Sequence, residues 1–318
     1  MKDLLRTLDL SKADFKYLLN RSRKFKASPH GRRSLLSGES VCLYFTKPST
    51  RTRISFEAAV SRLGGSAIVL GPNDMQLGRG ETIEDTGRVI SRFTRAFVTR
   101  TYRHEDVERF AKVLSVPVIN ALTDSHHPCQ SVADMLTLLE HRGSLKHRRI
   151  AYFGDGNNVA VSLMEAAALS GVDCAIATPK NYAISQALVD EARAVAEANG
   201  ASLQITEDPE EAARGADALY TDVWLSMGDD DNERAQRQRA LQPYQVTRRL
   251  MGLAKPDAIF MHCLPAHRGE EVTEEVADGP QSVIFDQAEN RLHTAVAILY
   301  ALIEGKLTGR KSEDDQDA

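Results

Sequence analysis

The feature that most constrains the fold is a regular alternation of short apolar runs with longer segments of helical periodicity. The run Val41–Phe45 precedes a helical segment at Thr52–Leu63, and Ile150–Phe153 precedes another at Val159–Ser170. Strands that are separated by helices do not pair as hairpins, so this order predicts parallel pairing through βαβ units. We therefore expect an α/β protein built from doubly wound parallel sheets.

The same pattern continues over most of the chain. Further strands are expected at Ala67–Leu70, Ala96–Thr99, Val116–Ala121, Cys174–Ala177, Leu203–Ile205, Ala218–Thr221, Ala258–His262 and Val283–Phe285. Further helices are expected at Ser11–Lys26, Glu105–Leu114, Ser131–Arg142, Ser185–Asn199 and Glu289–Glu304. The first of these helices begins with a capping signal, because Ser11 is followed by Asp14 three residues later.

Chain length and one polar segment predict two domains. The chain has 318 residues, which is more than the roughly 250–300 residues that a single hydrophobic core usually supports. The basic segment Gly143–Arg149 interrupts the alternation, which then restarts. We expect one domain over 1–142, a second over 148–286, and a charged, disordered tail at 311–318.

Composition excludes several classes of protein. The 40 basic and 44 acidic residues give a net charge of −4, so no general attraction to nucleic acid or to anionic membranes is expected. No apolar run approaches the roughly 20 residues that cross a bilayer. The first 25 residues alternate apolar and charged side chains, unlike the apolar core of a secretory signal. A cytoplasmic protein is the resulting prediction.

The four cysteines are expected to be reduced thiols. None of them is spaced as CxxC, and a chain of this length needs no disulfide to fold. His127 with Cys129, and His262 with Cys263, could suggest zinc, but ligands so close in sequence rarely complete a tetrahedral site. We therefore expect no metal site.

A cluster of hydroxyl and guanidinium groups follows the run Val41–Phe45. Three hydroxyls and two guanidiniums lie in Ser49–Arg53, where the next helix begins. Free backbone N–H groups and the positive end of the helix dipole point the same way there, which suits a phosphate group. No GxxxxGK[ST] loop is present. The alternatives are a capped helix with solvated arginines and another kind of phosphate-binding α/β protein.

Polar side chains also follow other expected strands of the first half. Arg100 follows Ala96–Thr99, and His127 and Gln130 open the helix after the strand at Val116–Ala121. Ligands of open parallel sheets bind at the carboxyl ends of the strands. An imidazole and a carboxamide at that edge could both donate to a carbonyl oxygen, whereas a structural role is the alternative for His127.

Three loops that follow strands of the second half are candidates for ligand binding. The segment Gly154–Asn158 is similar to a dinucleotide-binding loop but lacks the third glycine, which disfavours a nicotinamide cofactor. The segment Asp222–Gly228 leads into three aspartates and is also interpretable as an acidic surface loop. In His262–Gly269, Cys263 is interpretable as a nucleophile or as a thiol that packs against a ligand.

Together these clusters resemble the carbamoyltransferase family, and in particular its ornithine-specific branch. The matching segments occur in the family's order and with family-like spacing, from about residue 40 to residue 295. They are Ser49–Arg53, Leu77–Thr82, His127–Gln130, Gly154–Asn158, Asp222–Gly228 and His262–Pro265. S-T-R-T with H-P-x-Q marks the family in general, whereas S-M-G and H-C-L-P-x-H-R-G point to ornithine rather than aspartate. The chain departs from the family pattern at Val161 and at Ser125–His126.

The resemblance implies a reaction, an assembly and an architecture. Carbamoyl phosphate and L-ornithine would give L-citrulline and phosphate by direct attack of the amine, with no cofactor. The first domain would bind carbamoyl phosphate, the second would bind ornithine, and a C-terminal helix at 289–310 would return to the first domain. A homotrimer or a multiple of it would form, with Gln76 reaching into the site of a neighbouring subunit.

The resemblance also implies roles for individual residues. Those implied to bind carbamoyl phosphate are Ser49, Thr50, Arg51, Thr52, Gln76, Arg100, His127, Gln130, Cys263, Leu264 and Arg291. Of these, the implied catalytic residues are Arg51, Thr52, Arg100, His127, Cys263 and Arg291. Ornithine would be bound by Asn158, Asp222, Ser226 and Met227. The alternatives are a carbamoyltransferase for another amine, such as putrescine, and a non-catalytic relative that serves as a scaffold.

Overall fold

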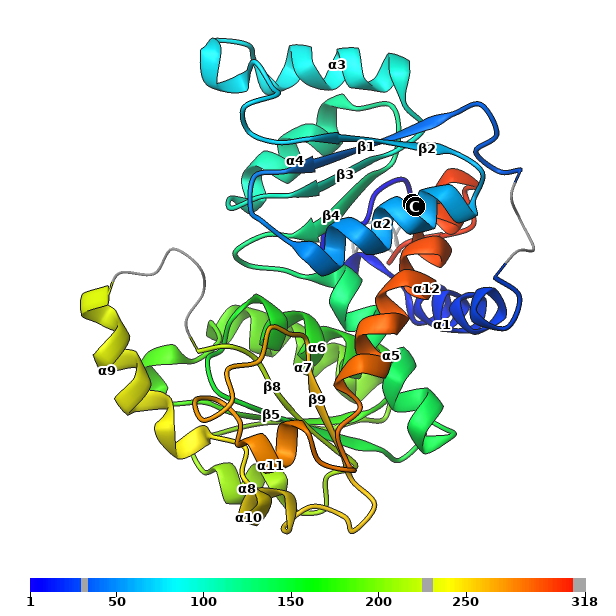
Figure 1. Ribbon diagram of the computed structural model, residues 1–318. Helices are drawn as coiled ribbons and strands as arrows, with labels where there is room; N and C mark the ends of the chain where they lie inside the picture. Colours follow the sequence, from blue (N-terminus) through cyan, green and yellow to red (C-terminus); the bar gives the residue numbers. More distant parts are fainter. Residues whose placement is uncertain (30–33, 225–230, 311–318) are drawn as a thin grey trace. The chain divides into compact units, whose positions relative to one another are not determined.

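The computed structural model describes residues 1–29, 34–224 and 231–310 of the chain. The chain forms two compact units, one from Met1–Ala133 with Glu289–Ala318 and the other from Asp134–Ala288. Each unit contains its own parallel sheet with helices around it, so the α/β prediction is confirmed (Figure 1). The predicted tail at 311–318 lies outside the described residues. Among the helices that the structure describes, none has the length and apolarity required to cross a membrane.

The first unit contains a four-stranded parallel sheet in the order β2-β1-β3-β4. Its strands are β1 (Ser40–Phe45), β2 (Ser66–Leu70), β3 (Phe97–Arg100) and β4 (Val118–Leu122). Its helices are η1 (Thr7–Asp9), α1 (Lys12–Ala27), α2 (Thr50–Arg62), η2 (Leu77–Arg79), α3 (Ile83–Phe93), α4 (His104–Val113), the start of α5 (Pro128–Arg142) and most of α12 (Ile284–Ile303). The predicted return of the C-terminal helix to the first unit is thereby confirmed.

Apolar side chains fix the layers of the first unit. Ile90 of α3 and Phe110 of α4 pack with Tyr44 and Phe97 of the sheet, so these two helices cover one face. Helix α2 lies on the other side of the sheet (Figure 1). The capping box predicted for the first helix is present, since the Ser11 side chain accepts a hydrogen bond from the Asp14 amide.

The second unit contains a five-stranded parallel sheet in the order β7-β6-β5-β8-β9. Its strands are β5 (Arg149–Phe153), β6 (Asp173–Ala177), β7 (Leu203–Thr206), β8 (Ala218–Thr221) and β9 (Ile259–His262). Its helices, besides the end of α5 and the start of α12, are α6 (Asn158–Ser170), η3 (Lys180–Tyr182), α7 (Gln186–Ala198), α8 (Pro209–Ala213), α9 (Asp231–Leu241), η4 (Gln242–Tyr244), α10 (Arg248–Met251) and α11 (Glu274–Ala277).

Alanine-rich packing closes the second unit. Ala151 and Ala175 of the sheet pack against Ala212 of α8, Leu250 of α10 and Val276 of α11 on one side. Helix α6 is buried along nearly its whole length, which explains why most of its side chains are apolar. Small side chains let helices approach a sheet closely.

One predicted strand is wrong. The run Val283–Phe285 was expected to be a strand before a helix at Glu289–Glu304, but α12 begins at Ile284. Extended pairing there is limited to one bridge between Ser282 and Phe260. A short run of apolar residues fits a strand and the first turn of a buried helix equally well, so periodicity could not separate the two.

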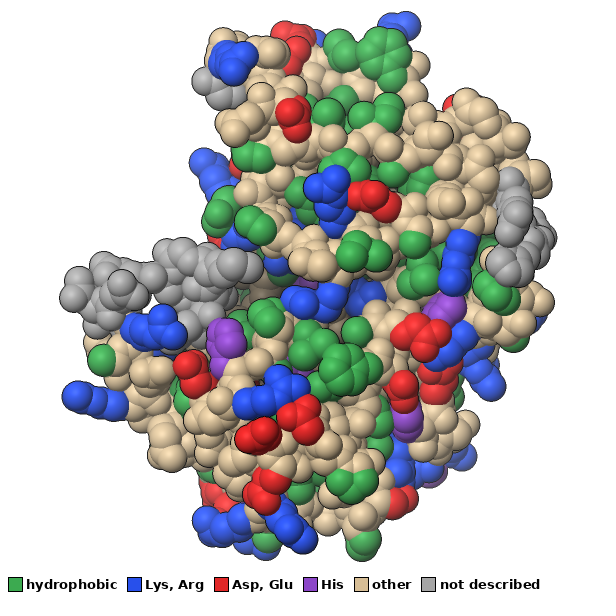
Figure 2. Space-filling model, in the orientation of Figure 1, with side chains coloured by type: hydrophobic (Ala, Val, Ile, Leu, Met, Phe, Trp, Pro, Cys, Tyr) green, Lys and Arg blue, Asp and Glu red, His purple; other side chains and the backbone are tan. Residues whose placement is uncertain are grey.

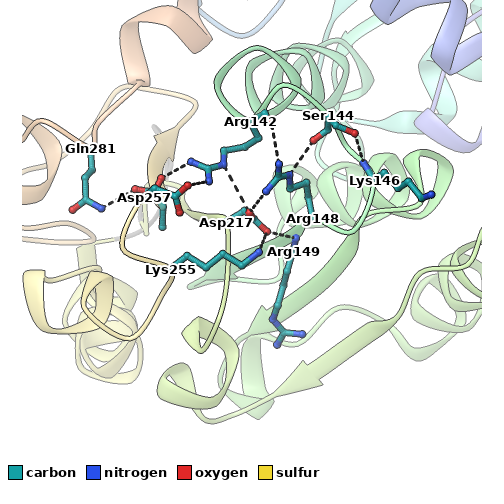
Figure 3. Close-up of polar contacts among 10 residues, drawn as sticks. Arg142, Ser144, Lys146, Arg148, Arg149, Asp217, Lys255, Asp257 and Gln281 are labelled. Atoms are coloured by element: carbon teal, nitrogen blue, oxygen red, sulfur yellow. Dashed lines mark hydrogen bonds and ion pairs between the residues drawn. The ribbon is translucent and has the colours of Figure 1, made fainter.

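A buried carboxylate fastens the connection between α5 and β5 within the second unit (Figure 3). The Asp217 side chain is fully buried and accepts hydrogen bonds from Arg148 (2.9 Å), Lys255 (2.7 Å) and the Arg149 amide (2.9 Å). The Nε atom of Arg142 lies 3.8 Å from the same carboxylate. The basic segment that suggested a domain boundary is thus tied to the amino-terminal edge of this sheet.

Parallel pairing places the loops of interest at one edge of each sheet. In the first unit, the carboxyl ends of β1, β3 and β4 lie at one edge of the sheet. Arg100 is the last residue of β3, while Ser49 and His127 lie in the loops that follow β1 and β4. In the second unit, β8 and β9 run in register from Ala218 and Ile259 to Thr221 and His262, so the residues after them emerge together. These are the edges at which open α/β sheets bind ligands.

The surface shown in Figure 2 mixes acidic and basic side chains. No field of one sign covers this face, in keeping with a net charge of −4. Anion binding therefore has to come from local clusters rather than from a general surface potential.

Candidate active site

The first cluster of candidate residues lies at the start of α2. Ser49 is the N-cap of this helix, and its hydroxyl accepts a hydrogen bond from the Thr52 amide at 3.2 Å. The capping alternative that the sequence left open is therefore part of the structure. It does not conflict with anion binding, because a helix start leaves other backbone N–H groups directed outward.

Two residues from distant parts of the chain complete this cluster. The Arg291 guanidinium of α12 donates to the Thr52 hydroxyl at 3.2 Å and also donates to the Gln130 side-chain oxygen. All three side chains are at least 96% buried. Because the Thr52 oxygen accepts from Arg291, its own hydroxyl proton is directed towards another acceptor. Thr52 is thus arranged as a donor.

His127 lies among positive charges and is 4% exposed. Burial, and then the charges of Arg291, Arg100 and Arg51, lower its pKa well below the usual value of 6.5. The imidazole is therefore uncharged at neutral pH. It is able to donate one N–H group to a developing negative charge, but it does not add a fourth positive charge to the cluster.

Gln76 is not gathered into this cluster. It is exposed before η2, where its backbone carbonyl accepts hydrogen bonds from the amides of Arg79 and Glu81. Among the described residues, none forms a hydrogen bond with its side chain. Thr50 is exposed at the first position of α2, beside the half-buried Arg51. Of the implied carbamoyl-phosphate residues in the first unit, Gln76 therefore stands apart.

A second cluster forms where β8 and β9 end. The Cys263 thiol donates to Asp222 Oδ1 at 2.8 Å, and the side-chain amide of Asn157 donates to Asp222 Oδ2 at 2.9 Å. The Val223 amide also donates to Asp222 Oδ1, at 2.8 Å. A carboxylate offers about four acceptor positions, so Asp222 keeps capacity for one more donor, such as an ammonium group.

Two buried tyrosines line the second cluster. Burial, and then nearby acidic groups including Asp222, raise the pKa of Tyr152 well above 10.0. Burial and then Asp134 do the same for Tyr220. Both phenols therefore stay protonated throughout the pH range in which an amine substrate would be used, so neither serves as a base.

The glycine-rich loop before α6 has a packing role. A Cβ atom on Gly156 would lie 2.6 Å from the Tyr182 carbonyl oxygen and the Ile184 amide nitrogen, so only glycine fits. Asn157 caps α6 by accepting from the amides of Val159 and Ala160. The geometry accounts for this loop without a dinucleotide. Asn158, which the resemblance implied as an ornithine residue, begins the helix next to Asn157.

Two further implied ornithine residues, Ser226 and Met227, lie outside the described residues. Of the two pairs that suggested zinc, His262 and Cys263 lie close to Asp222, and the ligand atoms of these three residues are within 4.8 Å of one another. However, both ring nitrogens of His262 already form hydrogen bonds, one with the Leu264 amide and one with Glu271. This donor set fits a hydrogen-bonded loop better than a metal centre.

Sequence reasoning missed three polar residues around the second cluster. Asn157 forms a hydrogen bond with Asp222. The His262 ring is held by Glu271, and the His262 backbone is held by Gln287. The adjacent asparagines and the charged end of H-R-G-E-E were visible signals. Nothing in the local sequence indicated that Asn157, rather than the adjacent Asn158, would bond to Asp222.

Comparison with known proteins covers both units. The carbamoyl-phosphate-binding domain model of the aspartate/ornithine carbamoyltransferases matches residues 2–140, and their Asp/Orn-binding domain model matches residues 146–302. The ornithine carbamoyltransferase of Halalkalibacterium halodurans is 49% identical over 307 residues, which are 96% of each chain. The catabolic ornithine carbamoyltransferase of Thermoplasma acidophilum is 48% identical over 302 residues, 95% of this chain and 98% of that one.

Solved structures agree with these relatives. The ornithine carbamoyltransferase of Pyrococcus furiosus superposes with a TM-score of 0.92 at 47% identity, covering 96% of this chain and 98% of that one. Domain models match both halves of the chain, and full-length relatives are nearly half identical to it. The chain therefore belongs to the aspartate/ornithine carbamoyltransferase family.

Proposed function

We propose that this protein transfers the carbamoyl group of carbamoyl phosphate to the side-chain amine of L-ornithine, giving L-citrulline and phosphate. The observation that carries the proposal is the pair of dissimilar clusters. One holds three guanidiniums around an uncharged imidazole at a helix start. The other holds a carboxylate bonded to a thiol. The first suits an acyl phosphate, and the second suits an amino acid.

In this proposal, the first cluster binds and activates carbamoyl phosphate. Ser49, Thr50, Arg51 and Thr52 hold the phosphate at the start of α2, and Arg100 bridges phosphate and carbonyl. Thr52 and His127 donate to the carbonyl oxygen, where negative charge develops during attack. Arg291 holds Thr52 by a hydrogen bond, and Gln130 accepts a second hydrogen bond from Arg291. Gln130 is assigned to the carbamoyl NH2 group.

The second cluster is assigned to ornithine. Asp222 receives the α-ammonium group at its remaining acceptor position, and Asn158, Ser226 and Met227 are proposed to complete the amino-acid site. Cys263 and the Leu264 backbone lie beside the reacting amine. The thiol proton is committed to Asp222, so the sulfur presents lone pairs to the amine N–H groups.

The chemical step needs a neutral amine. An alkylamine with a pKa of about 10.4 is neutral in fewer than about one molecule in a thousand at pH 7. Its lone pair attacks the carbonyl carbon, the bond from that carbon to the phosphate oxygen breaks, and the amine proton passes to the departing phosphate. The arginine cluster stabilises the leaving group, while fixed positions for both reactants supply up to about 7–11 kcal/mol.

The direct test is citrulline formation by the purified protein from ornithine and carbamoyl phosphate, with putrescine as the competing amine. Because a site built to bind a charged α-group rejects a substrate that lacks it, putrescine should be used about 10⁴-fold less efficiently. Equal use of putrescine would favour the other carbamoyltransferase. Binding of a phosphonate analogue without any turnover would favour the scaffold.

We also propose a homotrimer, or a multiple of it, in which Gln76 serves a neighbouring subunit. Its exposed position supports this, as do the exposed Ile54 of α2 (62%) and Ile68 of the outer strand β2 (41%). Two inactive variants, Gln76→Ala and Arg51→Ala, should regain activity when mixed trimers are formed. If trimers shown to be mixed regain no activity, a site shared between subunits is contradicted.

A cytoplasmic location is also proposed, because all four cysteines are thiols.

A further inference from the structure

We infer that the buried pair His262 and Glu271 is a positioning device, which holds the Leu264 backbone and the Cys263 thiol in the geometry that the ornithine amine requires. The inference rests on the proposed function, since it concerns the same reaction. Neither residue belongs to the proposed carbamoyl-phosphate or ornithine site. Both side chains are fully buried, directly behind the Cys263–Leu264 loop.

The hydrogen bonds determine which nitrogen of His262 carries the proton. The Leu264 backbone amide can only donate, and it donates to His262 Nδ1 at 2.8 Å. Nδ1 is therefore an acceptor without a proton. The proton of the neutral ring lies on Nε2, which faces Glu271 Oε1 at 3.2 Å. The carboxylate of Glu271 thus selects the tautomer that holds Leu264.

Leu264 needs such a restraint. Its φ angle is +61°, in the left-handed region that residues other than glycine rarely adopt. Such a conformation persists only where the surroundings specify it. The hydrogen bond from its amide to His262 is one such determinant, and it acts on the peptide next to Cys263.

The His262 backbone and the Glu271 side chain are anchored in turn. The His262 amide donates to the Gln287 side chain at 2.8 Å, and Gln287 donates to the buried Asp134 at 2.7 Å. Glu271 also accepts a hydrogen bond from the His267 amide. Because backbone and ring are held separately, the ring cannot turn without breaking a buried hydrogen bond. The loop is therefore fixed before ornithine binds.

Paired substitutions separate the two hydrogen bonds of the ring. In His262→Asn, the side-chain oxygen replaces Nδ1 and still accepts from Leu264, but it is too short to reach Glu271. In His262→Gln, the amide reaches Glu271 and leaves the Leu264 amide without its acceptor. Similarly, Glu271→Gln keeps an acceptor for Nε2, whereas Glu271→Leu removes it. His267→Gln, an exposed histidine in the same loop, is the matched control.

Each variant is assayed for kcat and KM with either substrate varied, after its thermal unfolding has been recorded. We expect His262→Gln and Glu271→Leu to lower kcat/KM for ornithine by about 100-fold, as displacement of a reacting group by about 1 Å does. His262→Asn and Glu271→Gln should lose less than about tenfold, and His267→Gln should match the wild type. KM for carbamoyl phosphate should change much less than kcat/KM for ornithine, because the phosphate-binding residues at the start of α2 are not altered.

Several results would overturn the inference. Folded His262→Gln or Glu271→Leu proteins with near-normal use of ornithine would do so, as would a greater loss in His262→Asn than in His262→Gln. If His262→Gln and Glu271→Leu do not fold, the result for Glu271→Gln tests the inference. This variant still offers His262 Nε2 an oxygen acceptor, so a 100-fold loss of kcat/KM in the folded variant would contradict the inference. An inactive wild type would instead refute the proposed function.

Discussion

The buried carboxylate of Asp217 offers a sharp test of how the second unit is stabilised. Its side chain is fully buried, and three cationic side chains surround it, those of Arg142, Arg148 and Lys255 (Figure 3). The substitution Asp217→Asn keeps the shape of the side chain but removes its charge. An NH2 group would also face donors where an acceptor is required.

The expected loss follows from burial. Removing one partner of a buried ion pair costs about 3–5 kcal/mol, because the remaining charges lose the group that offset their desolvation. The outer cations, which are 26% and 38% exposed for Arg148 and Lys255, recover part of their hydration. We therefore expect the lower limit, about 3 kcal/mol, which is roughly 100-fold in the unfolding equilibrium.

The contribution of Asp217 also has a defined pH dependence. Burial acts to raise its pKa, but hydrogen bonds from Lys255, the Arg149 amide and Arg148 outweigh it and lower the pKa. A lowered pKa in the folded state means that the stabilisation is present above the unfolded value of about 3.9. It is lost as the pH falls from that value through the folded pKa. Between pH 5 and pH 8 the contribution should be constant.

Urea unfolding at pH 7, at one protein concentration, measures the effect. The matched control is Asp190→Asn, which breaks an exposed pair with Arg193 and should cost no more than about 1 kcal/mol. If Asp217→Asn lies within about 1 kcal/mol of the control, the buried cluster does not stabilise the unit as argued.

Four further outcomes follow from the sites. Arg51→Lys should lower kcat by about 100-fold, because an ammonium group lacks the forked donors of a guanidinium, and should leave the circular dichroism spectrum unchanged. Near-normal turnover would remove Arg51 from the mechanism. His127→Asn should also lower kcat by about 100-fold but leave the rise of activity between about pH 6 and 8.5 unchanged, because that rise belongs to the amine; an altered profile would show that the ring titrates. The pKa of His126 is lowered by burial to about 3. As the unfolded His126 side chain binds a proton, this residue alone should cost about 2 kcal/mol of stability between pH 7 and pH 5, and His126→Leu should reduce the pH dependence by that amount; equal pH slopes in urea titrations would contradict this. Iodoacetamide should label Cys263 before the three buried cysteines of the native protein, and peptide mass spectrometry showing another site first would disagree with the described exposure.

The sequence by itself determined features that depend on near neighbours. Apolar periodicity predicted parallel sheets, and Ser11 with Asp14 predicted a helix start, because both signals act within a few residues. The hydroxyls and guanidiniums of Ser49–Arg53 predict an anion site for the same kind of local reason, since a helix start supplies its own N–H groups, and this prediction remains part of the proposed function. The family resemblance rested on the order of such local segments. Sequence patterns did not predict helices α3, α8, α9, α10 and α11, and at Val283–Phe285 they did not distinguish a strand from a helix.

Tertiary structure decided what depends on strand order and on packing. Thr52 and Arg291 are 239 residues apart, yet they share a hydrogen bond. Sequence gave no sign that His127 would be uncharged, since its pKa depends on burial and on charges from three distant segments. The bond between Cys263 and Asp222 exists because β8 and β9 are paired in register. Local residues can specify an element, but which side chains meet is set by long-range contacts that no short segment encodes.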